Sequence, residues 1–309
     1  MAKRFDVDCR SAVNYIRNRF QTTFSRKIAG VGILERIVSV KSAFIIFFMS
    51  AASCAFGQEG ALSLSWLPKD RLMPVFAANS TEHRMSLTRI LKNNQYIGGM
   101  GGMFPVVTAT LAGHEVQFGI GGTLYTQFLR SRAHLEVVNA DFYADFLIDY
   151  RLDDERVLRI GMGHTSQHLV DDALEILGYQ KSINYVRDYL QSFFLQRIGV
   201  MKGFVYGGFY YQYRFRIPQP GNYHWLFEIG GEGLNEEITT NLFVYLAVDI
   251  KFREESNFAT TQSYQAGFRL KGSAHSLRLA YSYRTGIEER GQFYLQRIHW
   301  NTLGLFFEL

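Results

Sequence analysis

The stretch NLFVYLAVDIKF, residues 241–252, decides the fold, because its side chains alternate strictly in character. One face of the stretch carries only apolar side chains: Leu242, Val244, Leu246, Val248, Ile250 and Phe252. The opposite face carries polar or charged ones: Asn241, Tyr245, Asp249 and Lys251. Successive side chains of a β-strand point to opposite sides, so the stretch predicts a strand with one apolar and one charged face.

Residues 141–151, DFYADFLIDYR, repeat the same alternation. Phe142, Phe146, Ile148 and Tyr150 share one face, and the other face carries Asp141, Asp145, Asp149 and Arg151. The apolar faces of a soluble sandwich need only meet each other, whereas 18 Tyr and 26 Phe suit an outward apolar band with aromatic girdles around a polar lumen. We therefore expect an all-β fold, a transmembrane antiparallel β-barrel.

Alternating stretches recur along the chain and predict about twelve strands, an even number as bacterial barrels have. They are residues 83–91, 103–111, 115–129, 140–151, 156–166, 184–198, 202–215, 223–233, 240–252, 260–270, 275–285 and 298–309. The expected connections alternate between short ones, such as 112–114 and 152–155, and longer ones, such as 92–102, 130–139 and 167–183. This order predicts short periplasmic turns and long outer loops, with the barrel over residues 83–309.

Residues 1–57 differ in composition from the rest and predict a leader with a signal peptide for export. They carry nine Lys or Arg and three acids, and they end in the uncharged run SAFIIFFMSAASCAFG. Basic residues, a short apolar core and small residues follow one another as in a secretory signal. The region before the apolar run is long, so either translation starts downstream of Met1 or a further leader precedes the signal. Acylation of Cys54, as in a lipoprotein, is an alternative.

The chain without residues 1–57 keeps 24 basic and 25 acidic residues, a net charge near −1. A nucleic-acid partner would need a clustered basic face on the folded domain, so none is expected. Both cysteines, Cys9 and Cys54, also fall in residues 1–57, which excludes a disulfide scaffold for the rest.

The last residues, TLGLFFEL, predict a C-terminal strand that the barrel assembly machinery recognises. Thr302, Gly304, Phe307 and Leu309 have the spacing of that signal, with Leu309 where a terminal Phe is commoner. An ordinary amphipathic last strand is the alternative.

Residues 58–82 do not alternate, and they contain two of the five prolines. We expect a periplasmic N-terminal segment or a plug that reaches the barrel mouth. Together with LPKDRLMPVFAA in this segment, the motifs VNADFYADF, HTSQHLVDD, KFREESNF and GQFY carry a resemblance over residues 66–309. The chain resembles a bacterial family recorded as domain of unknown function, number 1207. The resemblance implies a location in the outer membrane of a Gram-negative type cell and no established activity. Gln167 and Val170 depart from the family's Ser-Ser-His-Leu-Gly-Asp-Glu.

His164 and Ser166 are candidate catalytic residues. In the strand expected over residues 156–166, the even-numbered Leu158, Ile160 and Met162 are apolar, so His164 and Ser166 are expected to point outward, toward lipid. A serine needs an adjacent base to act as a nucleophile, and the base needs an orienting group. This outward His-x-Ser is similar to the arrangement in outer-membrane phospholipase A and lipid A deacylases, although Gln167 stands where those enzymes have Asn. A polar strand end among lipid headgroups is the alternative.

Asn184, at the start of the next strand, is one candidate to orient the imidazole. The acids that follow HTSQHLV are others: Asp171, Asp172 and Glu175. Carboxylates are also ligands for calcium, so the same three acids are candidate calcium ligands if the chain is a hydrolase. A solvated acidic loop is the alternative, and no other cofactor is expected.

Three functions follow from these observations. The first is a structural or binding surface protein whose lumen is filled by charged pairs among Asp141, Asp145, Arg159, Asp249 and Arg278. The second is an outer-leaflet lipid esterase, with membrane lipids as its partners. The third is a narrow channel. The sequence leaves open whether the protein is an enzyme.

Overall fold

The computed structural model describes residues 62–111, 113–131, 134–170, 173, 178, 182–217, 221–273 and 275–308. The strands within these residues are β1 (Ser63–Trp66), β2 (Met85–Ile90), β3 (Gln95–Leu111), β4 (His114–Ser131), β5 (His134–Arg151), β6 (Arg156–Leu169), β7 (Tyr185–Ile198), β8 (Gly203–Arg216), β9 (Trp225–Thr239), β10 (Leu242–Arg253), β11 (Ala259–Lys271), β12 (Ser276–Ile287) and β13 (Arg297–Glu308). Short 3-10 helices cover Gly199–Met201, Glu254–Ser256 and Gly291–Phe293. No helix in this part of the chain is both long enough and apolar enough to cross a membrane.

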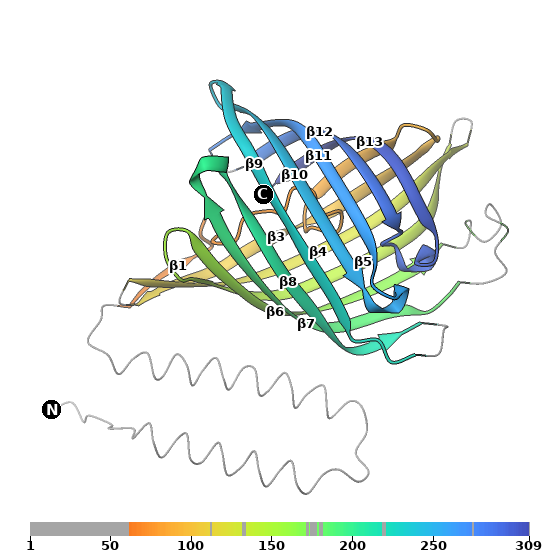
Figure 1. The fold of residues 1–309 in the computed structure, drawn as a ribbon, viewed down its shortest axis with the longest axis horizontal. Coiled ribbons are helices and arrows are strands. Elements are labelled where there is room, and N and C mark those ends of the chain that lie inside the picture. The colour runs from red at the N-terminus through yellow and green to blue at the C-terminus, as the bar shows by residue number, and fades with distance from the viewer. Residues whose placement is uncertain are drawn as a thin grey trace, which may run out of the picture. The chain divides into compact units, whose positions relative to one another are not determined.

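Strands β2 to β13 form a closed antiparallel barrel of twelve strands. Figure 1 shows the barrel. Each strand from β3 to β13 pairs with the next, and β13 pairs with β2, which pairs in turn with β3. β1 pairs with the C-terminal end of β3, on the same side as β2, which pairs with the N-terminal end. β1 therefore does not add a thirteenth strand to the ring. Each strand from β2 to β13 therefore has a neighbour on both sides, which is the condition for crossing a bilayer with strands. The predicted all-β barrel is confirmed.

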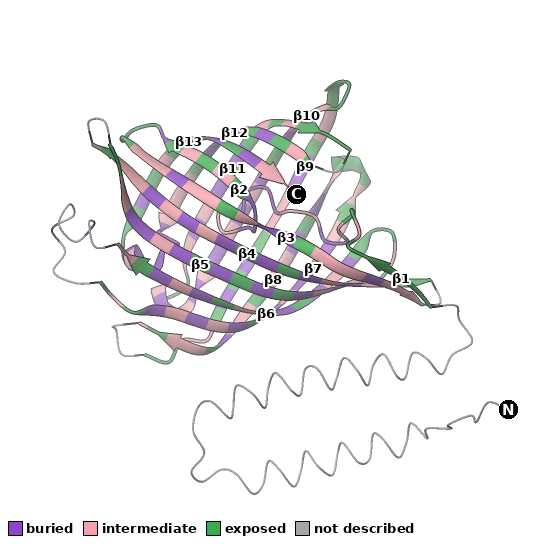
Figure 2. Ribbon diagram, turned by 180° about the vertical axis from the view of Figure 1, so that it is seen from behind, coloured by how far each residue is buried: buried purple, intermediate pink, exposed green. Residues whose placement is uncertain are grey.

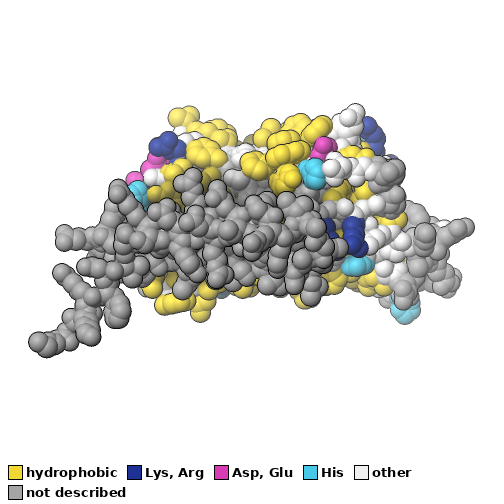
Figure 3. Space-filling view, turned by 90° about the horizontal axis from the view of Figure 1, so that it is seen from below, with side chains coloured by type: hydrophobic (Ala, Val, Ile, Leu, Met, Phe, Trp, Pro, Cys, Tyr) yellow, Lys and Arg dark blue, Asp and Glu magenta, His cyan; other side chains and the backbone are white. Residues whose placement is uncertain are grey.

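The two faces of the wall follow the predicted alternation. In β10, Tyr245 and Asp249 are buried in the lumen, whereas Leu246 between them is 50% exposed on the outside. Figure 2 shows the resulting stripes of buried and exposed residues along each strand. Figure 3 shows hydrophobic side chains gathered on the outward surface of the barrel. The barrel therefore presents an apolar outer face and encloses a charged interior.

Strand boundaries lie within about three residues of the prediction except at three expected connections. β9 runs to Thr239, although its strand was expected to end at residue 233. Residues 92–102 and 130–139 are mostly strand, because β3 begins at Gln95 and β5 at His134. The glycines of IGGMGGMF have no side chains, so this part of β3 shows no alternation and was not predicted as strand. Gly101 is required there, because a Cβ at this position would lie 2.0 Å from the carbonyl oxygen of Gly122 in β4.

Connections at the two ends of the barrel differ in length. At one end, called here the short-turn end, the connections are 112–113, 152–155, 199–202, 240–241 and 272–275. At the opposite end, called the loop end, the connections include the longer 170–184, 217–224 and 288–296. β1 and the last residues of β13 both lie at the short-turn end, because β1 pairs with the end of β3 and β13 runs toward that end.

Residues 67–84, called here the inner segment, leave the wall after β1 and lie inside the barrel (Figure 1). Leu72, Met73 and Phe76 pack with inward side chains of β6, β7 and β8. The ring of Phe76 stacks on that of Tyr206, with centroids 3.7 Å apart and planes 3° from parallel. The strand expected at residue 83 begins at Met85, since His83 and Arg84 are buried and bonded within the lumen. Residues 1–57 and Leu309 lie outside the described residues.

Candidate functional site

The outward face of β6 carries three polar side chains near the loop end. Thr165 and Gln167 point inward, with exposed fractions of 1% and 0%. Their even-numbered neighbours therefore lie on the outside of the barrel: His164, Ser166 and His168. The outward positions before them, from Leu158 to Met162, are apolar. The candidate site thus lies where the apolar band of β6 ends.

His164 is held by a carboxylate on the neighbouring strand. It is the cross-strand partner of Asp188 in the β6–β7 ladder, and its Nδ1 lies 2.6 Å from Asp188 Oδ1. The imidazole is half exposed, while the carboxylate is 15% exposed. A carboxylate only accepts hydrogen bonds, so the contact holds the proton on Nδ1 and leaves Nε2 as the basic nitrogen. This is the arrangement that a general base requires.

Asp188 also faces a cation on β8. Arg214 Nη1 lies 3.6 Å from Asp188 Oδ2. A bulge in the β7–β8 ladder, between Asp188 and Tyr189, sets Arg214 opposite Asp188 on the outward face. The Asp188 carboxylate therefore lies between two basic side chains, with Oδ1 toward His164 and Oδ2 toward Arg214.

Ser166 lies on the same face of β6, two residues beyond His164. Two residues of a strand span about 6.6 Å, which is within reach of an imidazole and a hydroxyl turned toward each other. Within the described residues, no hydrogen bond joins the Ser166 hydroxyl to His164. Catalytic hydrogen bonds often close only when substrate is bound. The cross-strand neighbours of Ser166 are Phe142 and Val186, so its immediate surroundings are apolar.

The structure does not bring Asn184 to His164. Asn184 is exposed and directly precedes β7, four residues from Asp188, which is about 13 Å along a strand. The register, extended one step beyond the Gln167–Tyr185 pair, sets Asn184 opposite His168 instead. Sequence reasoning missed Asp188, although a signal was present: it is an acid among the even-numbered, largely apolar positions of β7.

The candidate calcium ligands Asp171, Asp172 and Glu175 lie outside the described residues. The described part of the chain contains no group of three or more His, Cys, Asp or Glu placed to hold a metal ion.

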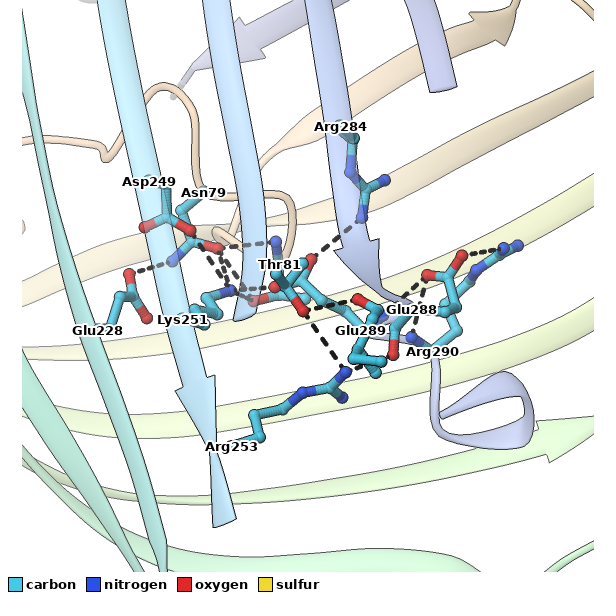
Figure 4. A network of polar contacts seen from close by, with 12 residues as sticks. Asn79, Thr81, Glu228, Asp249, Lys251, Arg253, Arg284, Glu288, Glu289 and Arg290 are labelled. Carbon is cyan, nitrogen blue, oxygen red and sulfur yellow. Dashed lines mark hydrogen bonds and ion pairs between the residues drawn. The ribbon is translucent and has the colours of Figure 1, made fainter. Parts of the chain in front are cut away.

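A second polar cluster, called here the lumen network, fills the interior near the loop end (Figure 4). Lys251 of β10 lies at its centre. Its ammonium donates to Asn79 Oδ1 at 2.9 Å and Thr81 Oγ1 at 3.0 Å in the inner segment, and to Glu289 Oε1 at 2.6 Å in the 288–296 loop. Asn79 donates in turn to Glu228 Oε1 at 2.9 Å. One buried cation therefore joins the wall, the inner segment and a loop.

The acids of the 288–296 loop are held ionised by neighbouring cations. Burial acts to raise the pKa of Glu289, but the charges of Lys251 and Arg284 outweigh it and lower the pKa to about 2. Burial likewise opposes ionisation of Glu288, and Arg290, 2.7 Å away, lowers its pKa below the usual range. The loop is therefore fixed in the lumen by ion pairs.

The five charged residues expected to pair in the lumen are all buried: Asp141, Asp145, Arg159, Asp249 and Arg278. They do not pair with one another, which corrects the expected pairing.

Each ionic partner comes from outside that set. Arg159 holds Asp149, its cross-strand neighbour, through two hydrogen bonds of 2.6 and 2.8 Å. Asp145 accepts from His83 of the inner segment at 2.6 Å. Arg278 lies 2.5 Å from Glu308. Strand register and the inner segment, neither of which was known from the sequence, set these partners.

Comparison with solved structures finds bacterial outer-membrane barrels. Outer membrane phospholipase A from Escherichia coli is similar with a TM-score of 0.45 and 11% identity, over 73% of this chain and 92% of that chain. The calcium-bound phospholipase dimer from Salmonella typhi gives 0.45 and 12%, over 73% and 90%. OccAB2 from Acinetobacter baumannii gives 0.30 and 10%, over 80% and 73%.

No curated protein matches the sequence. A family model does match it, over residues 56–309, which is most of the chain. The chain therefore belongs to the family described as protein of unknown function (DUF1207).

Proposed function

We propose that this protein is an outer-membrane esterase that hydrolyses an acyl ester of a membrane lipid, with Ser166 as nucleophile, His164 as base and Asp188 as the group that orients the base. The observation that carries the proposal is the 2.6 Å contact between His164 and Asp188 on the outward face. An imidazole and a carboxylate at the end of an apolar band need a role there, because polar groups facing lipid are costly.

The position of the site suits a lipid ester. His164 lies five residues before the end of β6 at the loop end, where outward residues change from apolar to polar. The ester bonds of membrane lipids lie at the same boundary, between acyl chains and headgroups. Both ends of the described barrel chain lie at the short-turn end, which in outer-membrane barrels faces the periplasm. The loop end then faces outward, so the substrate would come from the outer leaflet.

The reaction follows from the residues in place. Nε2 of His164 takes the proton of the Ser166 hydroxyl as Oγ attacks the ester carbonyl carbon, and Asp188 stabilises the imidazolium that forms. The imidazolium then gives this proton to the departing alcohol oxygen, which leaves an acyl-serine. Water, deprotonated by the same nitrogen, attacks the acyl carbonyl carbon, and the imidazolium returns the proton to Ser166 Oγ as the bond to the acyl group breaks and the fatty acid leaves.

Reconstitution in lipid vesicles tests the proposal. Purified protein in vesicles of phospholipid, or of phospholipid with lipopolysaccharide, should release fatty acid. Ser166→Ala and His164→Ala should each abolish most of the release while the heat-dependent shift in gel mobility, a sign of a folded barrel, is kept. The two changes together should be little worse than either alone, because the residues act as one unit.

A matched control is Ser192→Ala. Ser192 is also a serine on the outward face, in β7 opposite Ile160 of β6, away from His164. It should keep full activity. An assay with calcium and one with a chelator show whether the proposed acidic ligands, Asp171, Asp172 and Glu175, take part. Absence of hydrolysis by the unaltered protein toward both lipids would overturn the proposal.

The occupied lumen supports this function over a channel. The inner segment and the first residues of the 288–296 loop lie within the ring of strands and are tied to it by buried hydrogen bonds and ion pairs. A filled barrel makes a rigid scaffold for a site on its outer wall. Reconstitution in a planar bilayer should therefore give little conductance, and frequent open steps would favour the channel instead.

A further inference from the structure

A cavity remains inside the barrel between the inner segment and strands β5 to β10. Its volume is about 70 Å³, which is room for several water molecules or a small solute. Side chains of the inner segment such as Phe76 and His83 line one side, and the wall supplies the other. This cavity is separate from the outward face of His164, and its chemistry does not depend on the esterase proposal.

One cation that lines this cavity has no carboxylate of the described residues within ion-pair distance. The lining cations are Arg159, Arg187, Lys251 and Arg253. Arg159 lies near Asp149, Lys251 near Glu289 and Arg253 near Glu255. Within the part of the chain that the structure describes, no acid forms an ion pair with Arg187, although this residue is only 8% exposed. Its guanidinium instead lies over the ring of Tyr185, 5.2 Å from the centroid.

Buried polar atoms without partners surround the same cavity. Among the described residues that line it, these atoms are Arg187 Nε, Thr165 Oγ1, both amide atoms of Gln212, and Nε and Nη1 of Arg253, whose Nη1 lies 3.8 Å from Glu255. Thr165 and Gln212 are each 1% exposed, and Thr165 is the cross-strand neighbour of Arg187. Gln212 lies opposite Tyr189 on the next strand. Buried polar groups in folded proteins are nearly always bonded, so a cluster of unbonded polar atoms in one cavity indicates a bound solute.

The donors share one electrostatic requirement. Arg187 offers a charged, planar fork, and the hydroxyl of Thr165 and the amide nitrogen of Gln212 add neutral donors. The described acids that also line the cavity are Glu82, Asp145 and Glu289, and each already accepts a hydrogen bond: Glu82 from the backbone N–H of Phe76, Asp145 from His83, and Glu289 from Lys251. The unbonded donors of Arg187, Thr165 and Gln212 would therefore be satisfied by a hydrogen-bond acceptor with negative charge.

We propose that this cavity binds the oxyanion group of a small solute, a carboxylate or a phosphate, through Arg187, Thr165 and Gln212. The guanidinium fork matches two oxygens of such a group, and burial strengthens the pairing. The ligand also supplies the charge that Arg187 lacks in the lumen.

Calorimetric titration of the full protein in detergent tests the proposal, with inorganic phosphate and propionate as probes. At least one probe should bind saturably with one site per chain, and the difference between them shows which oxyanion fits. Arg187→Gln should weaken this binding about tenfold or more, because it removes the charge and the fork. Arg216→Gln is the matched control, since Arg216 is an exposed arginine at the end of β8 and should bind as the unaltered protein does.

A second variant keeps the test decisive if Arg187→Gln fails to fold. Thr165→Val removes one donor and no charge, and should weaken binding several-fold while the barrel stays folded. The proposal is overturned if neither probe binds at millimolar concentration, or if Arg187→Gln and Thr165→Val bind as tightly as the unaltered protein. Equal loss in Arg216→Gln would also overturn it, because binding would then reflect general attraction of anions.

Discussion

Lys251 Nζ lies 2.6 Å from Glu289 Oε1, and both side chains are almost fully buried inside the barrel. The same ammonium donates to Asn79 and Thr81, so three parts of the chain that are far apart in sequence meet at one charge. Any change at Lys251 therefore acts on the inner segment and the 288–296 loop together.

Lys251→Met should destabilise the barrel by about 3–5 kcal/mol, because it leaves the carboxylate of Glu289 buried without its main partner. The midpoint of urea unfolding in detergent measures the loss. Lys202→Met is the control: Lys202 lies 2.5 Å from Glu236, but the two side chains are 57% and 46% exposed. An exposed pair contributes only about 0–1 kcal/mol, so equal effects of the two changes would contradict the role of Lys251.

Stability should fall in acid through Glu289. Its pKa in the folded protein is about 2, below the ordinary value of 4.5, so the ionised form stabilises the fold. This contribution is complete above about pH 4.5 and is lost as the pH falls toward 2, with an upper limit of about 3 kcal/mol. Unfolding midpoints between pH 7 and pH 2.5 measure it. Glu289→Gln should be less stable at pH 7 and should show a flatter pH profile.

Asp188→Asn should lower the proposed esterase activity by about 10²–10⁴-fold, because an amide no longer fixes the imidazole tautomer or stabilises the imidazolium. Release of fatty acid in vesicles gives the measurement. Asn184→Ala should have little effect, since Asn184 lies four residues from Asp188 along β7. A larger loss with Asn184→Ala than with Asp188→Asn would show that another residue orients the base.

Phe76→Ala should cost about 3–5 kcal/mol, because the ring is 3% exposed and stacks on Tyr206. Urea unfolding in detergent would show the loss. Phe268→Ala removes an equal ring from the outward face, where it is 48% exposed, and should cost much less. If the two variants unfolded alike, the inner segment would not be packed in the lumen as described.

Alternation alone predicted the barrel and its strands, because every second side chain of a barrel strand points into the lumen. The pattern is visible in the sequence around Asp249 and around Asp145. The predicted strand starts were wrong by more than two residues at Gln95 and His134, where glycines or polar runs carry no alternation, and the predicted end of β9 was wrong by six residues.

The candidate site was only partly readable. Alternation along β6 predicts that His164 and Ser166 point outward, and the structure has both on that face. Their partner depends on how β7 is shifted against β6, which sets Asp188 and not Asn184 beside His164. Register is fixed by ladder hydrogen bonds between strands, and a single sequence does not contain it.

The sequence by itself determined which side chains face lipid and which face the lumen, since that property is local to each strand. Only the tertiary structure decided what meets inside: that the inner segment enters the barrel, that Lys251 bridges it to Glu289, and that no acid of the described residues forms an ion pair with Arg187. These contacts join residues up to 172 positions apart, and they form only when the ring of strands closes around the inner segment.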